Sequence, residues 1–322
     1  MSHADHALFL READVEALLT MDEAIEAVEA AFRALGQGRA ENRPRVRAYV
    51  PGGVLNVMCA ALPEAGGLGL KSYTGFRGGV RFLALLYSAE DGRLLAVMEA
   101  DRLGQMRTGA ASGVATRLLA RADATTVGLI GAGWQAQSQL LAVCTVRPIQ
   151  TVQVYSRTAS RAQAFAQMMS AQLGITVTPV PSAEAAVRDV DIIITATNSR
   201  NPVLQGDWLR PGQHINAIGS NQAVRRELDS AAVLRCDRVI VDQLEQARIE
   251  AGDLIAPITE GRFSWDQVDE LAAVVTGRAP GRTRPDEITL FKSLGLAIED
   301  MAVAARVYTR ALAEGRGERL PF

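Results

Sequence analysis

The stretch Val127–Gln139 reads V-G-L-I-G-A-G-W-Q-A-Q-S-Q and decides the fold. A short apolar run enters a turn at Gly131 and Gly133, and a helix-like stretch follows at once. Gly131 permits a tight turn, Gly133 lets backbone approach a phosphate without an intervening Cβ, and Ala136 lets the helix pack closely on the strand. An ordinary strand–helix turn can also need glycines. The flanking strand and helix favour a dinucleotide whose phosphates bind free N–H groups at the positive helix end.

The chain after this turn predicts a parallel sheet. Apolar strands alternate with helical stretches, the pattern of βαβ units buried on both faces. Strands are expected over residues 127–130, 151–155, 175–180, 192–196, 214–218 and 238–241. Helices are expected over residues 160–173, 183–190 and 295–310.

The first hundred residues predict a different organisation. Apolar residues at helical spacing indicate a helical region over Ala13–Leu35, which Gly36 and Gly38 end. Alternating segments then predict an antiparallel meander over residues 43–50, 54–61, 69–73, 82–88 and 94–99. A helix rich in glycine, alanine and serine is expected over Asp101–Ala120, which makes sense where another element or a ligand must approach closely.

Composition excludes several classes of protein. The 322 residues carry a net charge of −2, which gives no electrostatic case for nucleic acid or an anionic membrane. We see no signal peptide at the N-terminus and no apolar run long enough to span a bilayer. Cys59, Cys144 and Cys236 are scattered without a C-x-x-C pair, so we expect a reducing, cytoplasmic setting.

Histidine is too scarce for a metal site or a Ser-His-Asp triad. We expect His3 and His6 to lie in a frayed leader, which leaves His214 alone. We expect His214 to be a structural residue of a strand and no metal to be bound.

Lysine is scarcer still relative to arginine. Of the 34 lysines and arginines, only Lys71 and Lys292 are lysine. A position that stays lysine can need a compact ammonium group whose pKa can be tuned, although two lysines could also survive by chance. We take Lys71 as a candidate catalytic residue because of its neighbours.

The residues after the second strand of the dinucleotide unit bear on cofactor choice. NAD sites place an acid there, on the ribose 2′-hydroxyl. Here Tyr155 is followed by Ser156, Arg157 and Thr158, with no acid nearby. Arg157 can pair with a 2′-phosphate to which both hydroxyls can donate, so NADP(H) is favoured and NAD(H) stays possible. The alternative is a solvated loop arginine.

Two further groups of arginines precede the turn. Arg107 and Thr108 stand near the start of the small-residue helix, where an arginine could hold a carboxylate or a phosphate. Arg43, Arg45 and Arg47 accompany the first strand of the meander. Three arginines in five residues are typical of a solvated face, and spacing alone does not choose among them.

The chain resembles the ornithine cyclodeaminase/mu-crystallin family over nearly its whole length and in the correct order. The runs that carry the resemblance are Pro44-Arg45, Gly69-Leu70-Lys71, Met106-Arg107-Thr108-Gly109-Ala110-Ala111, Gly131-Ala132-Gly133-Trp134-Gln135-Ala136, Thr195-Ala196-Thr197-Asn198-Ser199, Ile215-Asn216-Ala217-Ile218-Gly219, Arg226-Glu227-Leu228-Asp229 and Thr289-Leu290-Phe291-Lys292-Ser293-Leu294-Gly295. Each run alone is weak, but together they are specific.

The resemblance implies an α/β fold with a Rossmann NAD(P)-binding domain and an α+β substrate and dimerisation domain. The expected boundaries are 1–120, completed by a C-terminal helix over 302–322, and 121–301 for the Rossmann domain. The resemblance also implies a homodimer.

The resemblance further assigns roles to individual residues. An arginine and a lysine that match Arg45 and Lys71 hold the substrate carboxylate, and an arginine that matches Arg107 serves both substrate and dinucleotide. The dinucleotide positions implied in the matching runs are Thr108, Gly131, Gly133, Trp134, Gln135, Ala136, Thr197, Asn198, Ile218 and Ser293, in addition to Ser156, Arg157 and Thr158.

One departure changes the expected chemistry. Cyclodeaminases of the family carry an aspartate for proton transfer where this chain has Asn221. An amide cannot serve as a general base, so Asn221 is expected to hydrogen-bond the substrate. The Phe291–Gly295 run and the Ser156–Thr158 segment look closer to the mu-crystallin branch, which reduces ketimines.

These observations favour an NAD(P)H-dependent oxidoreductase. The expected reaction reduces a C=N bond in the imine of a small keto acid and an amine, or oxidises an amino acid in reverse. Lys71, Arg107 and Asn221 are the expected catalytic residues. Two alternatives stay open: an ornithine cyclodeaminase with catalytic NAD, and a mu-crystallin-type binding protein for NADP(H) and a small ligand.

Overall fold

The computed structural model describes residues 6–321 and divides the chain into two compact units. Unit 1 comprises Met1–Ala110 and Leu296–Phe322, and unit 2 comprises Ala111–Gly295. These divisions fall earlier in the chain than the expected boundaries at 120 and 301. His3 lies outside the described residues.

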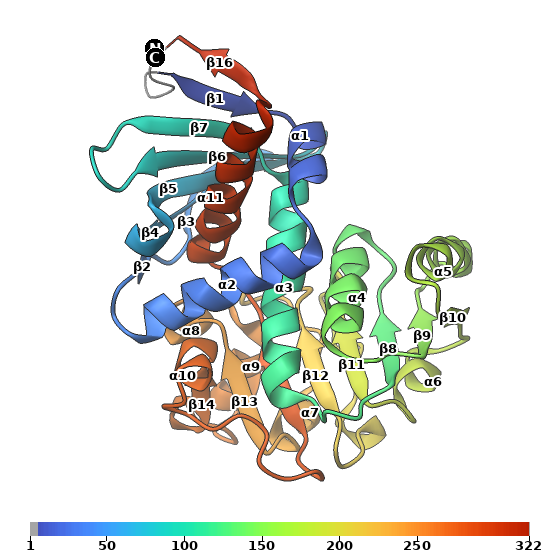
Figure 1. Cartoon of the computed structure of the whole chain (residues 1–322). Helices are drawn as coiled ribbons and strands as arrows, with labels where there is room; N and C mark the ends of the chain where they lie inside the picture. The colour runs from blue at the N-terminus through green and yellow to red at the C-terminus, as the bar shows by residue number, and fades with distance from the viewer. Residues whose placement is uncertain (1–5, 322) are drawn as a thin grey trace. The chain divides into compact units, whose positions relative to one another are not determined.

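Unit 1 contains a mixed sheet in the order β16-β1-β7-β6-β5-β4-β2, with β3 paired to β4 (Figure 1). Its strands are β1 (Ala7–Leu10), β2 (Glu41–Asn42), β3 (Val46–Val50), β4 (Gly53–Leu62), β5 (Gly67–Phe76), β6 (Gly79–Ser88), β7 (Leu94–Glu99) and β16 (Glu318–Leu320). The predicted antiparallel meander is confirmed over β4–β7. The prediction missed β1 and β16, which are too short to show a pattern and pair with distant parts of the chain.

Helices cover one face of this sheet. α11 (Ala297–Glu314) packs across β4, β5 and β6, and α2 (Met21–Gly36) crosses it and contacts it (Figure 1). The single helical region expected over Ala13–Leu35 is wrong in one respect, because α1 (Glu12–Leu18) ends before α2 begins. Thr20 interrupts the helix: its hydroxyl accepts the N–H of Glu23, and the Glu23 carboxylate accepts the N–H of Thr20. This reciprocal cap starts α2 afresh.

The small-residue helix is confirmed as α3 (Asp101–Leu119). The division between the two units falls within it, after Ala110. The helix is uninterrupted at its glycines, Gly104, Gly109 and Gly113, which agrees with a requirement for close approach.

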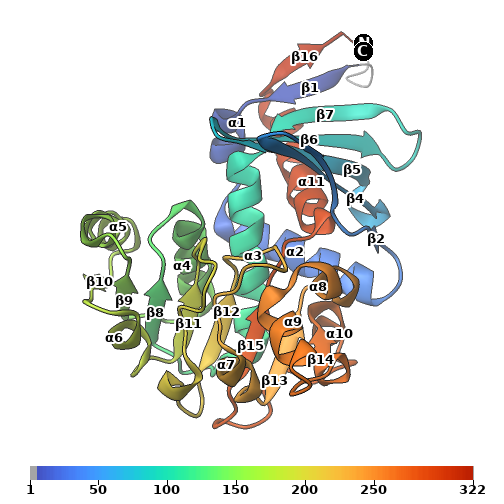
Figure 2. The same ribbon diagram turned by 180° about the vertical axis from the view of Figure 1, so that it is seen from behind.

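Unit 2 is a Rossmann fold. Its sheet is parallel throughout and runs in the order β10-β9-β8-β11-β12-β15-β13-β14 (Figure 2). The strands are β8 (Thr126–Ile130), β9 (Thr151–Tyr155), β10 (Thr176–Pro179), β11 (Ile192–Thr195), β12 (His214–Ala217), β13 (Arg238–Val241), β14 (Val268–Glu270) and β15 (Thr289–Lys292). The sheet order reverses at β8, between β9 and β11, and ligands of open α/β sheets bind at the carboxyl ends of the strands there.

The helices that flank this sheet agree with the sequence pattern where they are long. They are α4 (Trp134–Val146), α5 (Ala159–Leu173), α6 (Ala183–Val187), α7 (Ser230–Leu234), α8 (Leu244–Glu250), α9 (Gly252–Thr259) and α10 (Leu271–Val275). The prediction missed α7–α10, β14 and β15. These elements are only three to eight residues long, so little periodicity is available to read.

Candidate functional site

The glycine turn lies at the carboxyl end of β8, as the sequence predicts. Gly131 has φ +115°, and a Cβ there would lie 2.4 Å from the carbonyl oxygen of Ala196. The N–H of Gly131 donates to the carbonyl oxygen of Tyr155 at the end of β9. Only glycine fits a position with both this conformation and this close approach to the chain after β11.

The second glycine of the turn faces open space. No described atom lies within 4 Å of a Cβ built on Gly133, and Gly133, the N-cap of α4, has no side chain to cap the helix. Ala136 is fully buried where the helix meets the sheet. The hydroxyl of Ser293, after β15, is buried and has no hydrogen-bond partner among the described residues. These features fit a dinucleotide that supplies phosphates to the helix and a polar group to Ser293.

The end of β9 carries the segment expected to decide cofactor choice. Arg157 and Thr158 are exposed, and Ser156 is half-buried and accepts the N–H of Thr158. Asn198 is exposed and Thr197 half-buried in the segment after β11, and Ile218 follows β12. All of these positions stand after the carboxyl ends of parallel strands.

A buried carboxylate, Glu227, holds the segments after β11 and β12. Its Oε1 accepts the N–H of Thr197 at 2.6 Å, and its Oε2 accepts the N–H of Gly219 and the hydroxyl of Thr195, both at 2.7 Å. Burial raises the pKa of Glu227, while Lys292 opposes that shift. Glu227 thus fixes two loops that carry expected dinucleotide positions.

Lys292 is the centre of a second buried network in unit 2. Its Nζ lies 3.0 Å from Asp253 Oδ2 and donates to the carbonyl oxygen of Ser220 at 2.7 Å. Asp253 Oδ1 accepts the N–H groups of Glu227 and Leu228. The ammonium group thereby ties the end of β15 to the loop after β12.

In unit 1, Lys71 and Arg107 meet two carboxylates from the last helix. Lys71 Nζ donates to Asp300 Oδ1 at 2.7 Å, and Arg107 Nε lies 3.0 Å from the same oxygen. Arg107 Nη1 donates to Glu299 Oε2 at 2.7 Å. All four side chains are buried, and we call them the α11 cluster.

Burial and charge act in opposite directions on the two cations. Burial lowers the pKa of Lys71 to about 8, helped by Arg107 and Arg45 and opposed by Asp300. Burial also lowers the pKa of Arg107, but Asp300 and Glu299 outweigh it and hold that pKa above its ordinary value. Arg107 is therefore a permanent cation, whereas Lys71 can exchange a proton near neutral pH.

The structure separates the three early arginines that spacing could not. Arg43 is exposed and Arg47 half-buried, whereas Arg45 is buried, with its guanidinium carbon 6.0 Å from the centre of the Tyr73 ring. The expectation of a solvated face is wrong for Arg45, because it precedes β3 and turns inward there. Thr108 donates its hydroxyl to the carbonyl oxygen of Gly104.

With this geometry in view, comparison with known proteins identifies the family. The model of the ornithine cyclodeaminase/mu-crystallin family matches residues 5–315. The chain belongs to this family. The resemblance read from the sequence is thus confirmed.

Relatives within the family include enzymes of known activity. The chain is 38% identical to an alanine dehydrogenase of Archaeoglobus fulgidus, over 98% of each chain. It is 41% identical to a Thermococcus litoralis Δ1-pyrroline-2-carboxylate reductase solved with NADH and L-proline, which covers 97% of this chain and 100% of the reductase with a TM-score of 0.94. A dimeric archaeal alanine dehydrogenase with bound NAD has a TM-score of 0.92 at 38% identity and covers 98% of this chain and 99% of its own.

Sequence reasoning missed Glu299 and Asp300, the two acidic residues of the α11 cluster. Glu299 and Asp300 were not among the candidates, although they are consecutive acids inside the apolar stretch Ala297–Ala305. Two charges inside an otherwise apolar stretch of nine residues are the signal that could have found them. Glu227 stands within a run that marks the family, but nothing in the run indicates what its carboxylate holds.

Two other sequence expectations have clear outcomes. His214 is a fully buried residue of β12 whose Nδ1 lies 2.9 Å from the Thr289 hydroxyl, and burial lowers its pKa to about 3. It is a structural residue, as predicted. Asn221 is half-buried in the loop after β12, and its role towards substrate stays a prediction.

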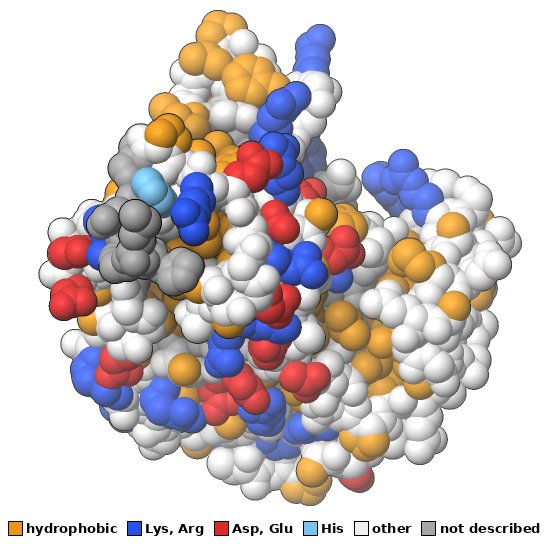
Figure 3. Space-filling view, turned by 45° about the horizontal axis from the view of Figure 1, so that its top comes forward, with side chains coloured by type: hydrophobic (Ala, Val, Ile, Leu, Met, Phe, Trp, Pro, Cys, Tyr) orange, Lys and Arg blue, Asp and Glu red, His pale blue; other side chains and the backbone are white. Residues whose placement is uncertain are grey.

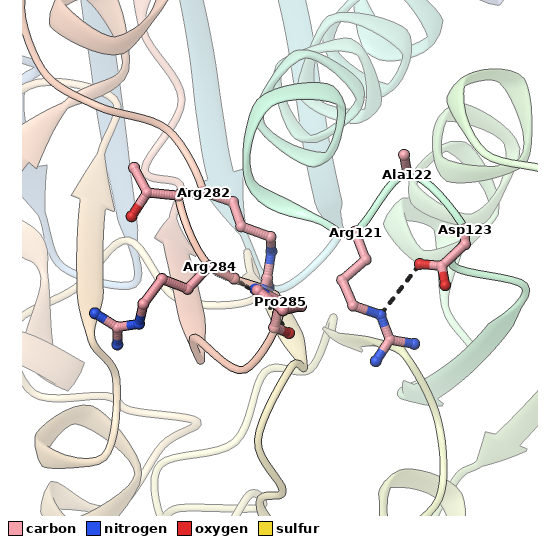
Figure 4. Close-up of a pocket in the computed structure, with 7 residues that line it drawn as sticks. Arg121, Ala122, Asp123, Arg282, Arg284 and Pro285 are labelled. Carbon is pink, nitrogen blue, oxygen red and sulfur yellow. Dashed lines mark hydrogen bonds and ion pairs between the residues drawn. The ribbon is translucent and has the colours of Figure 1, made fainter.

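An open depression of about 470 Å³ lies elsewhere, between the segments that precede β8 and β15 (Figure 4). Its arginines are engaged by the protein itself. Arg121 pairs with Asp123 and Asp191, and Arg282 donates to the carbonyl oxygens of Leu119 and Glu287. Because the glycine turn follows β8, this depression lies at the opposite strand ends and is not the candidate site.

The surface shows no charge pattern typical of nucleic-acid binding on the face drawn in Figure 3, where blue and red side chains are interspersed. Hydrophobic side chains gather towards the top of the same view (Figure 3). Within residues 6–321, every helix is too short or too polar to cross a bilayer.

Proposed function

We propose that this protein is an NAD(P)H-dependent oxidoreductase that reduces the C=N bond of a small imino acid, or oxidises the corresponding amino acid. The buried Lys71 ammonium beside the Arg107 guanidinium is the observation that carries the proposal. It offers a proton donor and a carboxylate-binding cation in a chain that also has a dinucleotide turn. The activities of the relatives, an imine reductase and amino-acid dehydrogenases, agree with it.

In this proposal, the three cations Arg45, Lys71 and Arg107 of unit 1 recognise the substrate. Arg45 and Arg107 hold its carboxylate, because guanidinium groups pair with carboxylates through two parallel hydrogen bonds. Asn221 hydrogen-bonds the substrate and exchanges no proton. Fixing the carboxylate orients the α-carbon for hydride transfer, and such positioning can lower a barrier by several kcal/mol, roughly 7.

Lys71 supplies the proton for the reduction. When bound, the dinucleotide supplies the hydride that reaches the imine carbon. The imine nitrogen takes a proton from Lys71 Nζ as the C=N π pair becomes its new N–H bond, and water then reprotonates the neutral amine of Lys71. With a pKa of about 8, Lys71 is mostly protonated at pH 7 yet can release its proton.

We propose NADP(H) as the preferred cofactor. Arg157 is exposed after β9, with hydroxyl residues on both sides and no acid in the position typical of NAD sites. The two solved relatives described above hold NADH and NAD. The proposed preference for NADP(H) therefore rests on Arg157 of this chain and not on those relatives. The phosphates would bind at the start of α4 beside Gly133, and the remaining contacts would come from the family positions given above.

We also propose that the protein is a homodimer that pairs through the sheet of unit 1. Val46 is 68% exposed and Tyr49 is 73% exposed on β3, and Phe76 and Val80 are exposed on β5 and β6. Exposed apolar groups on neighbouring strands are typical of an association surface.

We propose a cytoplasmic location, because the three free cysteines suit a reducing cytoplasm.

The test is an oxidation assay with NADPH and NADH over cyclic ketimine carboxylates and over pyruvate with varied amines. We expect turnover with at least one such substrate, and we expect the KM for NADPH to be lower than the KM for NADH. Tight binding of NADPH without turnover of any substrate would support a binding protein instead. Release of proline and ammonia from ornithine, with no net reduction, would support a cyclodeaminase.

A further inference from the structure

The carboxylate of Asp300 is shared by the two buried cations of the α11 cluster. Its Oδ1 receives both Lys71 Nζ, at 2.7 Å, and Arg107 Nε, at 3.0 Å. Its Oδ2 is buried and has no hydrogen-bond partner among residues 6–321. Lys71 therefore donates to the same oxygen that forms an ion pair with Arg107, which places the ammonium group beside the guanidinium group.

Two glycines lie close to this cluster. A Cβ on Gly69 would lie 2.1 Å from the carbonyl oxygen of Leu85 on β6, so glycine is required where β5 meets β6, and 2.7 Å from Met301 Sδ on α11. A Cβ on Gly104 would lie 3.4 Å from Lys71 Nζ, an ordinary contact distance, so the ammonium group reaches the backbone of α3 there. Close approach to α3, expected from its small residues, is thus made at Gly104 by Lys71.

The charged groups around Lys71 come from α3, from α11 and from the segment before β3. Arg107 approaches from α3 and Arg45 from the segment before β3, while Asp300 and Glu299 belong to α11. The Phe82 ring of β6 lies 5.8 Å from Nζ, and Tyr73 stands two residues along β5. Burial and both guanidinium groups favour the neutral amine, and Asp300 favours the charged one.

Glu299 provides a natural comparison within the same helix. It is as fully buried as Asp300, but its contact is with Arg107 Nη1. The main interactions that shift the pKa of Lys71 come from burial, Arg107, Asp300 and Arg45, with Glu299 not among them. The two adjacent carboxylates therefore act on different cations.

We infer that Asp300 is a positioning residue that keeps Lys71 protonated and aimed for proton transfer, whereas Glu299 pairs with Arg107. This inference rests on the proposed function, which supplies the imine substrate that receives the proton. The contact between Asp300 and Lys71 joins residues 229 positions apart, so it depends on the packing of α11 against β5.

The test uses the fact that the chain has two lysines. Protein grown with lysine labelled with ¹⁵N and ¹³C at the side-chain end gives two lysine signals in NMR, and Lys71→Met assigns them by removing one. The Lys71 signal is titrated between pH 6 and pH 11 in the full-length wild type, Asp300→Asn and Glu299→Gln. The pH profile of kcat/KM is recorded for the same three proteins.

We expect the Lys71 midpoint of Asp300→Asn to fall by about one pH unit or more, a tenfold weaker hold on the proton. Glu299→Gln, which removes an equal charge one residue away, should shift it by less than half as much. The limb of the kcat/KM profile should move with the NMR midpoint. A wild-type midpoint in Asp300→Asn, or equal shifts in the two variants, would overturn the inference.

A second variant covers the case in which Asp300→Asn does not fold. Asp300→Glu keeps the charge but displaces it, so its Lys71 midpoint should stay near that of the wild type while kcat falls about tenfold. A large downward shift in Asp300→Glu would contradict the inference. If the wild type shows no turnover while the NMR shifts occur as expected, the proposed function fails and the effect of Asp300 on Lys71 stands.

Discussion

The two lysines of this chain have the same kind of ion-pair partner but different charged neighbours. Each is buried and ion-paired with a buried aspartate: Lys71 with Asp300 in unit 1, and Lys292 with Asp253 in unit 2. Lys71 also has two guanidinium groups nearby, whereas Lys292 stands beside the carboxylates of Asp253, Glu227 and Asp242.

This difference in neighbours separates a reactive lysine from a structural one. Cations beside Lys71 weaken its hold on the proton, which suits proton transfer. Carboxylates beside Lys292 have their charge offset by the ammonium group, and they hold the backbone of the loops after β11, β12 and β15. Residue type alone therefore does not determine the role of a buried lysine. The following changes test this comparison.

The largest effect is expected at Lys71. Lys71→Met should reduce kcat by about 10³-fold or more, because the proton donor is lost, and should leave NADPH binding within a few-fold of the wild type. Stopped-flow turnover and NADPH fluorescence titration measure the two quantities. Equal losses in turnover and in cofactor affinity would contradict the role assigned to Lys71.

Lys292→Met should act mainly on stability. It leaves Asp253 buried without its counter-ion and should lower the free energy of unfolding by about 3–5 kcal/mol in urea denaturation. The matched control is Lys292→Met with Asp253→Asn, which keeps an acceptor for the N–H groups of Glu227 and Leu228 and removes the unpaired charge. We expect the double variant to recover part of the loss. A Lys292→Met protein with wild-type stability and no turnover would assign Lys292 a catalytic role instead.

Arg157 tests the cofactor side of the comparison. Arg157→Ala should raise KM for NADPH roughly tenfold to a hundredfold, the effect of losing charge-assisted hydrogen bonds to a phosphate. KM for NADH should change little, which makes NADH the internal control. An equal change for both cofactors would show that Arg157 does not contact a 2′-phosphate.

The smallest effect is expected from pH alone. The folded-state pKa of Lys71 lies near 8, below the ordinary value of 10.5, so the proton is lost as pH rises through 8. For imine reduction, kcat/KM at pH 9 should be about a tenth of its value at pH 7, and for amino-acid oxidation it should rise over the same interval. A reduction profile that stays level to pH 10 would exclude Lys71 as the proton donor.

The sequence predicted the local elements of the candidate site well. Gly131 and Gly133 identified the turn because each position needs a residue without a Cβ. Gly131 adopts a positive φ, and Gly133 leaves the backbone open to a ligand. Strands β9 and β13 begin and end as expected, since their apolar residues are bounded by turn residues. Arg45 was not separable from Arg43 and Arg47, because the side chain that turns inward is decided by what packs there.

The sequence by itself determined the Rossmann turn, the meander and the likeness to the family, because these depend on residues close together in the chain. Only the tertiary structure decided that Asp300 lies beside Lys71 and that Glu227 fastens the loops after β11 and β12. Such contacts join distant segments through helix packing and buried charge. The environment they create, more than the residue type, makes one lysine a proton donor and the other a structural counter-ion.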